Sequence, residues 1–279
     1  MKQLLVLSLF VFIVFNTQAQ YSKGSVEEMK KFKNADKIYV KLMNEKGHKF
    51  WSEAANPLFK NAIEKDWTMN SYEFLTYDEW RQKIKDKSLR DKFVLELEMK
   101  DISGGKAFTL KINLFPTTKS TAELFVTNEM GGAGAGESLA KMLNVYVKAI
   151  QRYINTCIEL NKTDPVEVAK SNYNYLKERK LYFFEYNLSS YAKKIMETEY
   201  KYDYEVLTDA NTYMGNFTSE SEKSAIYIKN YVAYYGVWYD MIIEPVEGRI
   251  LYYQKAGRGL SSMSKLSEEN AKILVSAPE

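Results

Sequence analysis

The most regular hydrophobic pattern in the chain runs from Glu137 to Asn161, near the middle of the sequence. Apolar residues recur there at alternating steps of four and three, which places them on one face of an α-helix. Other apolar residues flank this stripe, so we expect the helix to be covered on more than one side. A helix of this length would be about 37 Å long. The stripe consists of Leu139, Leu143, Tyr146, Ile150, Tyr153, Cys157 and Leu160.

The segments before this helix alternate between helical and strand patterns. Capping boxes that start at Ser25 and at Thr76 each begin a helix, and Asn56 followed by Pro57 begins another. Short runs of apolar and β-branched residues predict strands, of which the last three form a meander. The expected strands are Lys37–Met43, Tyr72–Leu75, Lys92–Met99, Phe108–Phe115 and Thr121–Thr127.

The same order of patterns returns after Asn161. Asp164 and Pro165 begin a helix that is expected to fold back on the long helix as a helical hairpin. Ser190 is predicted to cap the next helix, and a last helix is expected over Leu266–Val275. The strands expected in this half are Leu181–Tyr186, Tyr204–Thr208, Ala225–Tyr231, Trp238–Glu244 and Gly248–Tyr253.

Several local matches indicate that the chain contains two copies of one unit. Tyr72–Thr76 and Tyr204–Thr208 are identical at four of five positions, and Pro116 and Pro245 each end a strand of the meander. The mixed order predicts an α+β fold, with helices on one face of each sheet and a long helical hairpin between the copies. The second half of the long helix, around Cys157, is expected to set the angle between the two copies. The predicted division is a leader at 1–19, a tail at 20–24, copy one at 25–161 and copy two at 162–279.

The first residues have the pattern of a secretory signal peptide that is cut after Ala19. Lys2 supplies the positive charge, and Leu4–Phe15 is an uncharged apolar run. The alternative is a membrane anchor, which would need about 20 apolar residues. No Cys follows the apolar run, so processing as a lipoprotein is not expected. The leader, which ends in NTQAQ, resembles those of secreted proteins from the Bacteroidota.

The number of cysteines and the net charge limit the compartment in which the protein works and the partners that it can bind. Cys157 is the only cysteine, so no intramolecular disulfide can form, which favours a bacterial periplasm or cell surface over an animal secreted protein. The 39 basic and 36 acidic residues leave a net charge of +3. This near balance gives no support to binding of nucleic acid. The expected partner is an envelope protein, or a glycan or peptide ligand.

Two glycine-rich loops are candidates for an anion site. Each lies between a strand and a helix, where free backbone N–H groups at the start of the helix can bind an anion. Gly134 and Gly136 belong to the first loop, and Lys255 and Arg258 add positive charge at the second. The first loop lacks the Gly-Lys-Ser/Thr ending of a Walker loop. The favoured alternative is a flexible connection between sheet and helix, for which glycine is suited.

Candidate catalytic groups are few. His48 is the only histidine, and Cys157 is expected to be a small buried residue rather than a nucleophile. A zinc site or a Cys-His pair is therefore not expected. Asp240, Glu244 and Glu247 are expected to be solvated charges of a strand and a turn. The sequence thus predicts no catalytic residue, no metal and no cofactor.

Aromatic residues near the end of the chain offer an alternative ligand surface. Their ring faces can stack on sugars or peptides, whereas alternation along the strands sends about half of them into the core. These residues are Tyr231, Tyr234, Tyr235, Trp238, Tyr239, Tyr252 and Tyr253.

The order of elements in each copy resembles that of the amino-terminal domain of TolB and of related periplasmic domains of outer-membrane assembly and secretion factors. The segments KIYVKL, FKNAIEKDW and YEFLTYDEW carry the resemblance. It implies a role in the cell envelope and transfers no catalytic residue. The expected function is an exported, non-enzymatic binding or assembly module of the bacterial cell envelope. The alternative is a secreted hydrolase with a site at the interface of the two copies.

Overall fold

The computed structural model describes most of the chain after the predicted leader. The described residues are 24–44, 49–102, 105–116, 120–129, 135–216, 223–232, 237–258 and 265–278. The leader, His48, Gly134, Tyr234 and Tyr235 lie outside them, so what the sequence predicts for these residues stays a prediction.

The first unit consists of a mixed sheet with helices. Its elements are α1 (Val26–Lys33), β1 (Lys37–Lys41), α2 (Lys49–Asp66), β2 (Ser71–Leu75), α3 (Tyr77–Lys85), β3 (Phe93–Ile102), β4 (Gly105–Leu114), β5 (Ser120–Glu129) and α4 (Ala135–Leu160). The strand order is β2-β1-β3-β4-β5. β1 is parallel to both β2 and β3, and β3, β4 and β5 form an antiparallel meander.

The second unit repeats this arrangement. Its elements are α5 (Pro165–Lys170), η1 (Tyr173–Glu178), β6 (Lys180–Phe184), η2 (Glu185–Asn187), α6 (Ser190–Glu199), β7 (Tyr204–Leu207), α7 (Ala210–Gly215), β8 (Ser224–Val232), β9 (Val237–Glu244), β10 (Arg249–Arg258) and α8 (Glu268–Ser276). The strand order is β10-β9-β8-β6-β7, with β6 parallel to β7 and β8 and the remaining strands antiparallel. Read from the opposite edge, this is the topology of the first sheet. The α+β fold with two tandem units is therefore confirmed.

Most helix starts follow from their caps. Thr76 forms the predicted capping box, because its side chain accepts from the Glu79 N–H while the Glu79 carboxylate accepts from the Thr76 N–H at 2.8 Å. Asp164 caps α5 as predicted. The prediction for α6 is wrong by one residue: Ser189 is the N-cap, and its hydroxyl oxygen accepts from the Ala192 N–H at 3.1 Å. Ser190 is therefore the first residue of the helix.

Two further boundaries differ from the prediction. Asn56 does not start a helix, because α2 already begins at Lys49 and Pro57 lies inside it. The Asn56 amide instead bonds both backbone groups of Met43, accepting from its N–H at 2.8 Å and donating to its carbonyl at 3.2 Å. The second arm of the helical hairpin is short, since α5 ends at Lys170 and the chain continues as η1.

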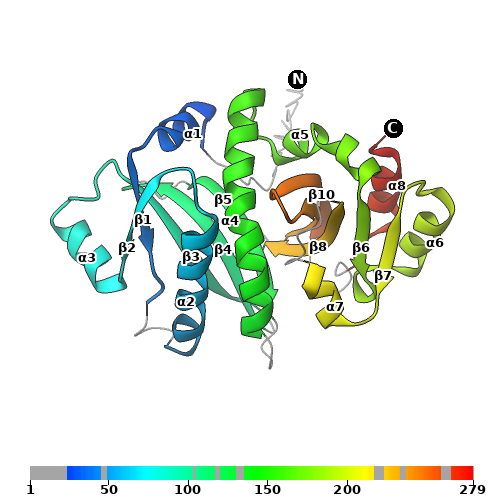
Figure 1. Ribbon diagram of the computed structural model, residues 1–279, viewed down its shortest axis with the longest axis horizontal. Coiled ribbons are helices and arrows are strands. Elements are labelled where there is room, and N and C mark those ends of the chain that lie inside the picture. Colours follow the sequence, from blue (N-terminus) through cyan, green and yellow to red (C-terminus); the bar gives the residue numbers. More distant parts are fainter. Residues whose placement is uncertain are drawn as a thin grey trace, which may run out of the picture.

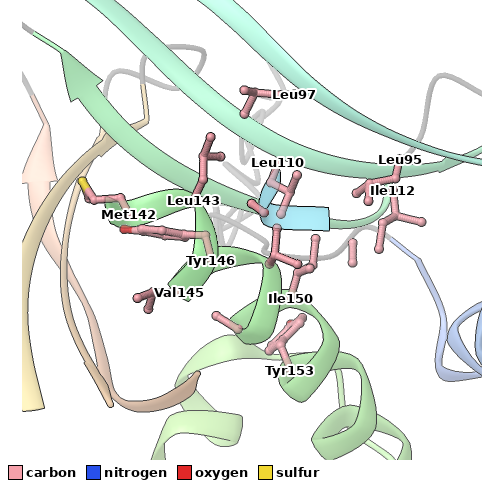
Figure 2. Close-up of a cluster of buried hydrophobic side chains, with 14 of the residues drawn as sticks. Leu95, Leu97, Leu110, Ile112, Met142, Leu143, Val145, Tyr146, Ile150 and Tyr153 are labelled. Carbon is pink, nitrogen blue, oxygen red and sulfur yellow. The ribbon is translucent and has the colours of Figure 1, made fainter. Parts of the chain in front are cut away.

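Helix α4 lies between the two sheets and packs on both (Figure 1). Its side chains meet Leu95, Leu97, Leu110 and Ile112 of the first sheet in one hydrophobic cluster (Figure 2). The same cluster continues into the second sheet. No helix in the described part of the chain, α4 included, combines the length and the apolar character that a membrane span needs.

The turn between β9 and β10 packs closely against the middle of α4. A Cβ at Gly248 would lie 2.4 Å from the Ala149 backbone nitrogen, and Gly248 has φ +70. Glycine is therefore required there for both space and conformation. Cys157 is buried as predicted, but Leu160 is 38% exposed and is not part of the buried stripe. The contact between the units thus includes the middle of α4 as well as its second half.

The second sheet has helices on both faces, which differs from the predicted arrangement with helices on one face of each sheet. On one face Tyr227 and Tyr252 pack with apolar residues of α6 and α8 in a separate hydrophobic cluster. On the other face Ile228 and Tyr253 join the cluster that surrounds α4. The strand alternation predicted for the late tyrosines is thus observed for the adjacent pair Tyr252 and Tyr253, and both are buried.

Candidate functional site

A pocket of about 400 Å³ opens at the carboxyl ends of the parallel strands β6 and β7. We call it the β6–β7 pocket. In open sheets with crossover helices, ligands commonly bind at this end of the strands. It is lined by Phe184, Glu185, Tyr186, Leu188, Ser189, Ser190, Lys193, Val206, Thr208 and Lys265.

The local sequence explains why the second unit has an opening here. After β6 the chain turns away in η2, and Ser189 then caps α6. In the first unit the chain instead continues beside β2 after β1, with the Leu42 N–H bonded to the Leu75 carbonyl at 2.9 Å. The Asn56 side chain holds the next residue, Met43, in place. The path of the chain after the first parallel strand therefore differs between the two units.

The first turn of α6 supplies polar groups to the pocket. The Ala192 N–H is taken by the Ser189 hydroxyl, and the Lys193 N–H by the Ser189 carbonyl at 2.9 Å. The N–H groups of Ser190 and Tyr191 precede these, so neither has an intrahelical acceptor. Within the described residues no other acceptor is seen for them or for the Ser190 hydroxyl. These donors stand at the positive end of the helix dipole.

Two lysines and an exposed tyrosine complete the lining. Lys193 and Lys265 are exposed, and neither forms an ion pair within the described part of the chain. The Lys265 ammonium lies 5.5 Å from the centre of the Tyr186 ring, which is itself 54% exposed. Glu185 is the acidic residue of the lining. The pocket is therefore mildly positive, with an apolar wall made by Phe184, Leu188 and Val206 among others.

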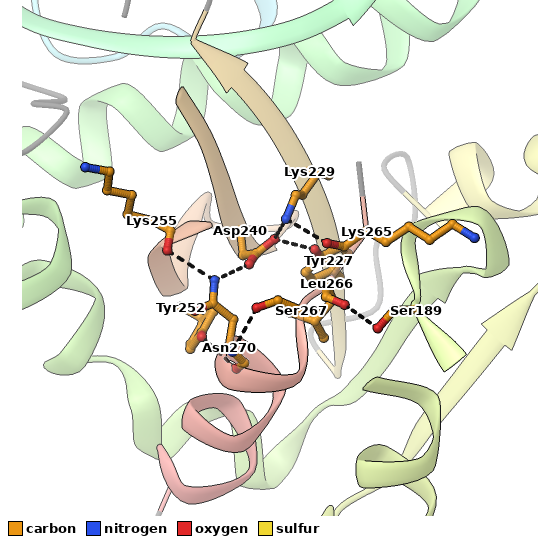
Figure 3. A network of polar contacts seen from close by, with 10 residues as sticks. All are labelled: Ser189, Tyr227, Lys229, Asp240, Tyr252, Lys255, Lys265, Leu266, Ser267 and Asn270. Atoms are coloured by element: carbon orange, nitrogen blue, oxygen red, sulfur yellow. Dashed lines mark hydrogen bonds and ion pairs between the residues drawn. The ribbon is translucent and has the colours of Figure 1, made fainter. Parts of the chain in front are cut away.

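The segment that carries Lys265 is fastened to the rest of the unit by its backbone. The Leu266 N–H donates to the Asn187 carbonyl at 2.7 Å, and the Leu266 carbonyl accepts from the Ser189 hydroxyl at 2.8 Å. The Lys229 ammonium donates to the Lys265 carbonyl at 3.0 Å. One wall of the pocket is thus held by hydrogen bonds to α6 on one side and to β8 on the other (Figure 3).

Behind this wall lies a buried polar network centred on Asp240 (Figure 3). The Asp240 carboxylate accepts from the Tyr227 hydroxyl at 2.5 Å, the Lys229 ammonium at 2.6 Å and the Asn270 amide at 2.5 Å. Burial lowers the pKa of Lys229, while Asp240 opposes that change. Burial, with the Asp240 charge, raises the pKa of Tyr227 well above its usual value. The network joins β8, β9 and α8.

The expectation that Asp240, Glu244 and Glu247 are solvated is wrong for two of the three residues. Asp240 is fully buried and Glu244 is 1% exposed, and only Glu247 lies at the surface. Asp240 tolerates burial because three donors surround it. Glu244 accepts from the backbone N–H groups of Val246 and Glu247 in the turn that follows. Alternation along β9 could not reveal the burial of Asp240, because its partners Tyr227, Lys229 and Asn270 come from other segments.

The structure places the predicted anion-site residues as follows. Gly136 lies in the first turn of α4, and Arg258 is the last residue of β10. Lys255 is exposed, its carbonyl accepts from the Asn270 amide at 3.2 Å, and its side chain points away from Asp240 and in the opposite direction to that of Lys265 (Figure 3). The anion site at the glycine loops stays a prediction.

Sequence reasoning missed the pocket and its residues. Three signals were available in the sequence: Ser189 shortly after a half-buried strand, a first helical turn without acidic residues, and Lys193 one turn into the helix. The glycine loops were candidates because N–H groups at the start of a helix can bind an anion. The same reasoning applies to the start of α6. Exposed aromatic side chains also occur outside the late tyrosine-rich segment that the sequence indicated, at Tyr186 and Tyr191.

The described residues offer no alternative centre of metal or thiol chemistry. No group of three or more His, Cys, Asp and Glu side chains that could hold a metal ion occurs among them. Cys157 is buried, and burial raises the pKa of its thiol to about 12. Comparisons of the chain with family models, with curated proteins and with solved structures found no match.

Proposed function

We propose that the protein is an exported, non-enzymatic binding module of the bacterial cell envelope, and that its second unit binds the ligand in the β6–β7 pocket. The observation that carries the proposal is the pocket itself. Its cavity of about 400 Å³ is within the usual size range of ligand sites. The cavity combines an apolar wall with backbone donors that have no acceptor, and lysines that have no ion-pair partner, among the described residues. The predicted leader and the resemblance in element order to periplasmic assembly domains support the location.

The arrangement of the two units supports this choice. Helix α4 joins the two sheets in one hydrophobic cluster. Where the structure describes the interface between the units, it is packed with apolar side chains. No observation thus favours the alternative of a hydrolase with a site at that interface.

A capture experiment tests the proposed site. The mature chain, Ser190→Trp and Lys194→Trp are immobilised and exposed to envelope extract of the source bacterium. Ser190 lines the pocket and is exposed, so an indole there fills the cavity without disturbing the core. Lys194 is exposed on the same helix and does not line the pocket, which makes Lys194→Trp the matched control. We expect a molecule retained by the wild type and the control and lost from Ser190→Trp. Equal retention by all three would refute the site.

The location is tested independently. Expression of the full chain in a Gram-negative host, followed by fractionation and amino-terminal sequencing, is expected to give a periplasmic or released protein that begins at Gln20. Recovery of the uncut chain from the cytoplasm would contradict export.

A further inference from the structure

We propose that the β6–β7 pocket binds a carboxylate that carries one negative charge and an apolar substituent, as at the carboxyl terminus of a peptide. This inference rests on the proposed function and names its ligand class. The carboxylate would be received by the free N–H groups of Ser190 and Tyr191 and by the Lys193 ammonium. Its apolar substituent would lie against the wall that Phe184 and Val206 help to form.

The donors define the anionic end of the ligand. Helix α6 has ten residues, so its first turn has the dipole of a full helix. Ser189 uses its own hydroxyl and carbonyl to satisfy the next two N–H groups, at Ala192 and Lys193. In the part of the chain that the structure describes, the donors that remain are the two adjacent backbone N–H groups of Ser190 and Tyr191, with the Ser190 hydroxyl beside them. A planar carboxylate has two oxygens that can accept from such a pair.

The charge of the lining favours a singly charged group. Two lysines and one glutamate line the pocket, so their sum is +1. A phosphate monoester would bring nearly two negative charges close to Glu185. The apolar side chains would also leave part of a free inorganic anion without partners. A monoanion attached to an apolar group therefore fits the lining better than phosphate does.

The neighbouring edge of the sheet suggests why the carboxylate would belong to a peptide. β7 is the last strand of its sheet in the described residues, and none of its four residues is buried. Its outer backbone groups can bond an added extended chain. A peptide lying along this edge could place its terminal residue in the pocket, whose lining includes Val206 and Thr208 from β7 and its end. A free small acid has the same chemistry without the edge contacts.

Defined probes test the ligand class on the mature chain by calorimetry or NMR titration. The probes are N-acetyl-Ala-Phe with a free carboxylate, its carboxyl amide, 3-phenylpropionate and inorganic phosphate. We expect the free peptide acid to bind at least about tenfold more tightly than the amide, because hydrogen bonds to a charged acceptor are stronger than those to a neutral one. Comparable binding of 3-phenylpropionate would identify a free small acid as the source and would keep the carboxylate assignment. Equal binding of acid and amide, or tighter binding of phosphate, would overturn it.

Variants at the helix start make the test specific. Ser190→Pro removes one of the two N–H donors, while proline is well tolerated at the first position of a helix. Ser189 already has φ -75 and ψ 162, which a following proline permits. We expect Ser190→Pro to weaken binding of the peptide acid about tenfold, and Ser190→Ala, which keeps the N–H, to weaken it less. Lys193→Ala should weaken binding and Lys194→Ala should not. Unchanged binding in both Ser190→Pro and Lys193→Ala would overturn the assignment.

The two proposals fail in distinguishable ways. If no carboxylate probe binds but Ser190→Trp still loses its captured molecule, the pocket is a binding site for another ligand class. If probe binding and capture are both unaffected by Ser190→Trp, the site itself is wrong. Circular dichroism and thermal unfolding of each variant show whether a loss of binding reflects loss of the fold.

Discussion

The ammonium nitrogen of Lys229 lies 2.6 Å from a carboxylate oxygen of Asp240, and their side chains are 3% and 0% exposed. Removing Lys229 would leave the buried Asp240 carboxylate without a balancing positive charge, although the Tyr227 and Asn270 donors would remain. We therefore expect Lys229→Met to lower the free energy of unfolding by about 3–5 kcal/mol, measured by urea denaturation. Because Lys229 also holds the Lys265 carbonyl, the variant should weaken ligand binding as well.

Two companion variants separate the charge from other effects. Lys229→Met combined with Asp240→Asn removes both charges and is expected to be more stable than Lys229→Met alone. Lys30→Met removes the Lys30–Glu27 pair, whose side chains are 45% and 75% exposed, and should leave the unfolding midpoint unchanged. A single Lys229 variant with wild-type stability would contradict the role assigned to the pair.

Gly248→Ala is expected to loosen the contact between the two units. The new Cβ would overlap the backbone of Lys148 and Ala149, and the positive φ disfavours any other residue. Strain and overlap together predict a loss of about 2–4 kcal/mol, measured by thermal or chemical unfolding. Gly215→Ala is the matched control, because nothing lies within 4 Å of a Cβ there. Similar losses in both variants would show that packing on α4 is not the cause.

Alkaline pH should destabilise the fold through its buried tyrosines. Burial raises the pKa of Tyr200, Tyr213, Tyr227 and Tyr252 above the value of about 10 that they have in an unfolded chain. The folded state therefore keeps protons that the unfolded chain releases. Their stabilisation is complete below about pH 10 and is lost as the pH rises toward the folded values. Denaturation midpoints that fall above pH 10, with a rise in tyrosinate absorbance on unfolding, are the expected result; constant midpoints up to pH 11 would contradict it.

The Cys157 thiol should react only after unfolding. It is completely buried, and burial raises its pKa to about 12, so little thiolate is present at neutral pH. A chromogenic thiol reagent should label one equivalent in denaturant and almost none in the native protein. Rapid labelling of the native protein would mean that α4 separates readily from its surroundings.

The fold was largely predictable because its signals are local. The spacing of Leu139, Leu143 and Tyr146 defines α4, and the repeated Tyr-Glu-x-Leu-Thr segments mark equivalent strands in the two units. Caps at Thr76 and Asp164 were readable for the same reason. The start of α2 was not, because the Asn56 side chain bonds Met43, thirteen residues earlier, and not the helix that follows Pro57.

The site was not predictable because its parts come together only in the folded chain. Lys265 reaches the pocket from a segment 72 residues after Lys193, and both line it. From the sequence alone, Asp240 is expected to be an exposed charge on a strand. In the folded chain its carboxylate is buried and accepts hydrogen bonds from Tyr227, Lys229 and Asn270. The loop before α4 is rich in glycine, which made it a candidate anion site. The start of α6 has no such composition, because its N–H groups follow an ordinary Ser189 cap.

Helix α4 belongs to the first repeat by sequence, but it closes the hydrophobic core on both sides. A repeat of this kind cannot be moved as an independent module, because the second unit without α4 would expose the face that carries Ile228 and Tyr253. We expect one cooperative unfolding transition for the whole chain and no stable fragment from a cut at Asn161. Binding at one end of the second sheet would then stabilise the first unit as well, so that occupancy of the pocket would be measurable as protection of amides throughout the molecule.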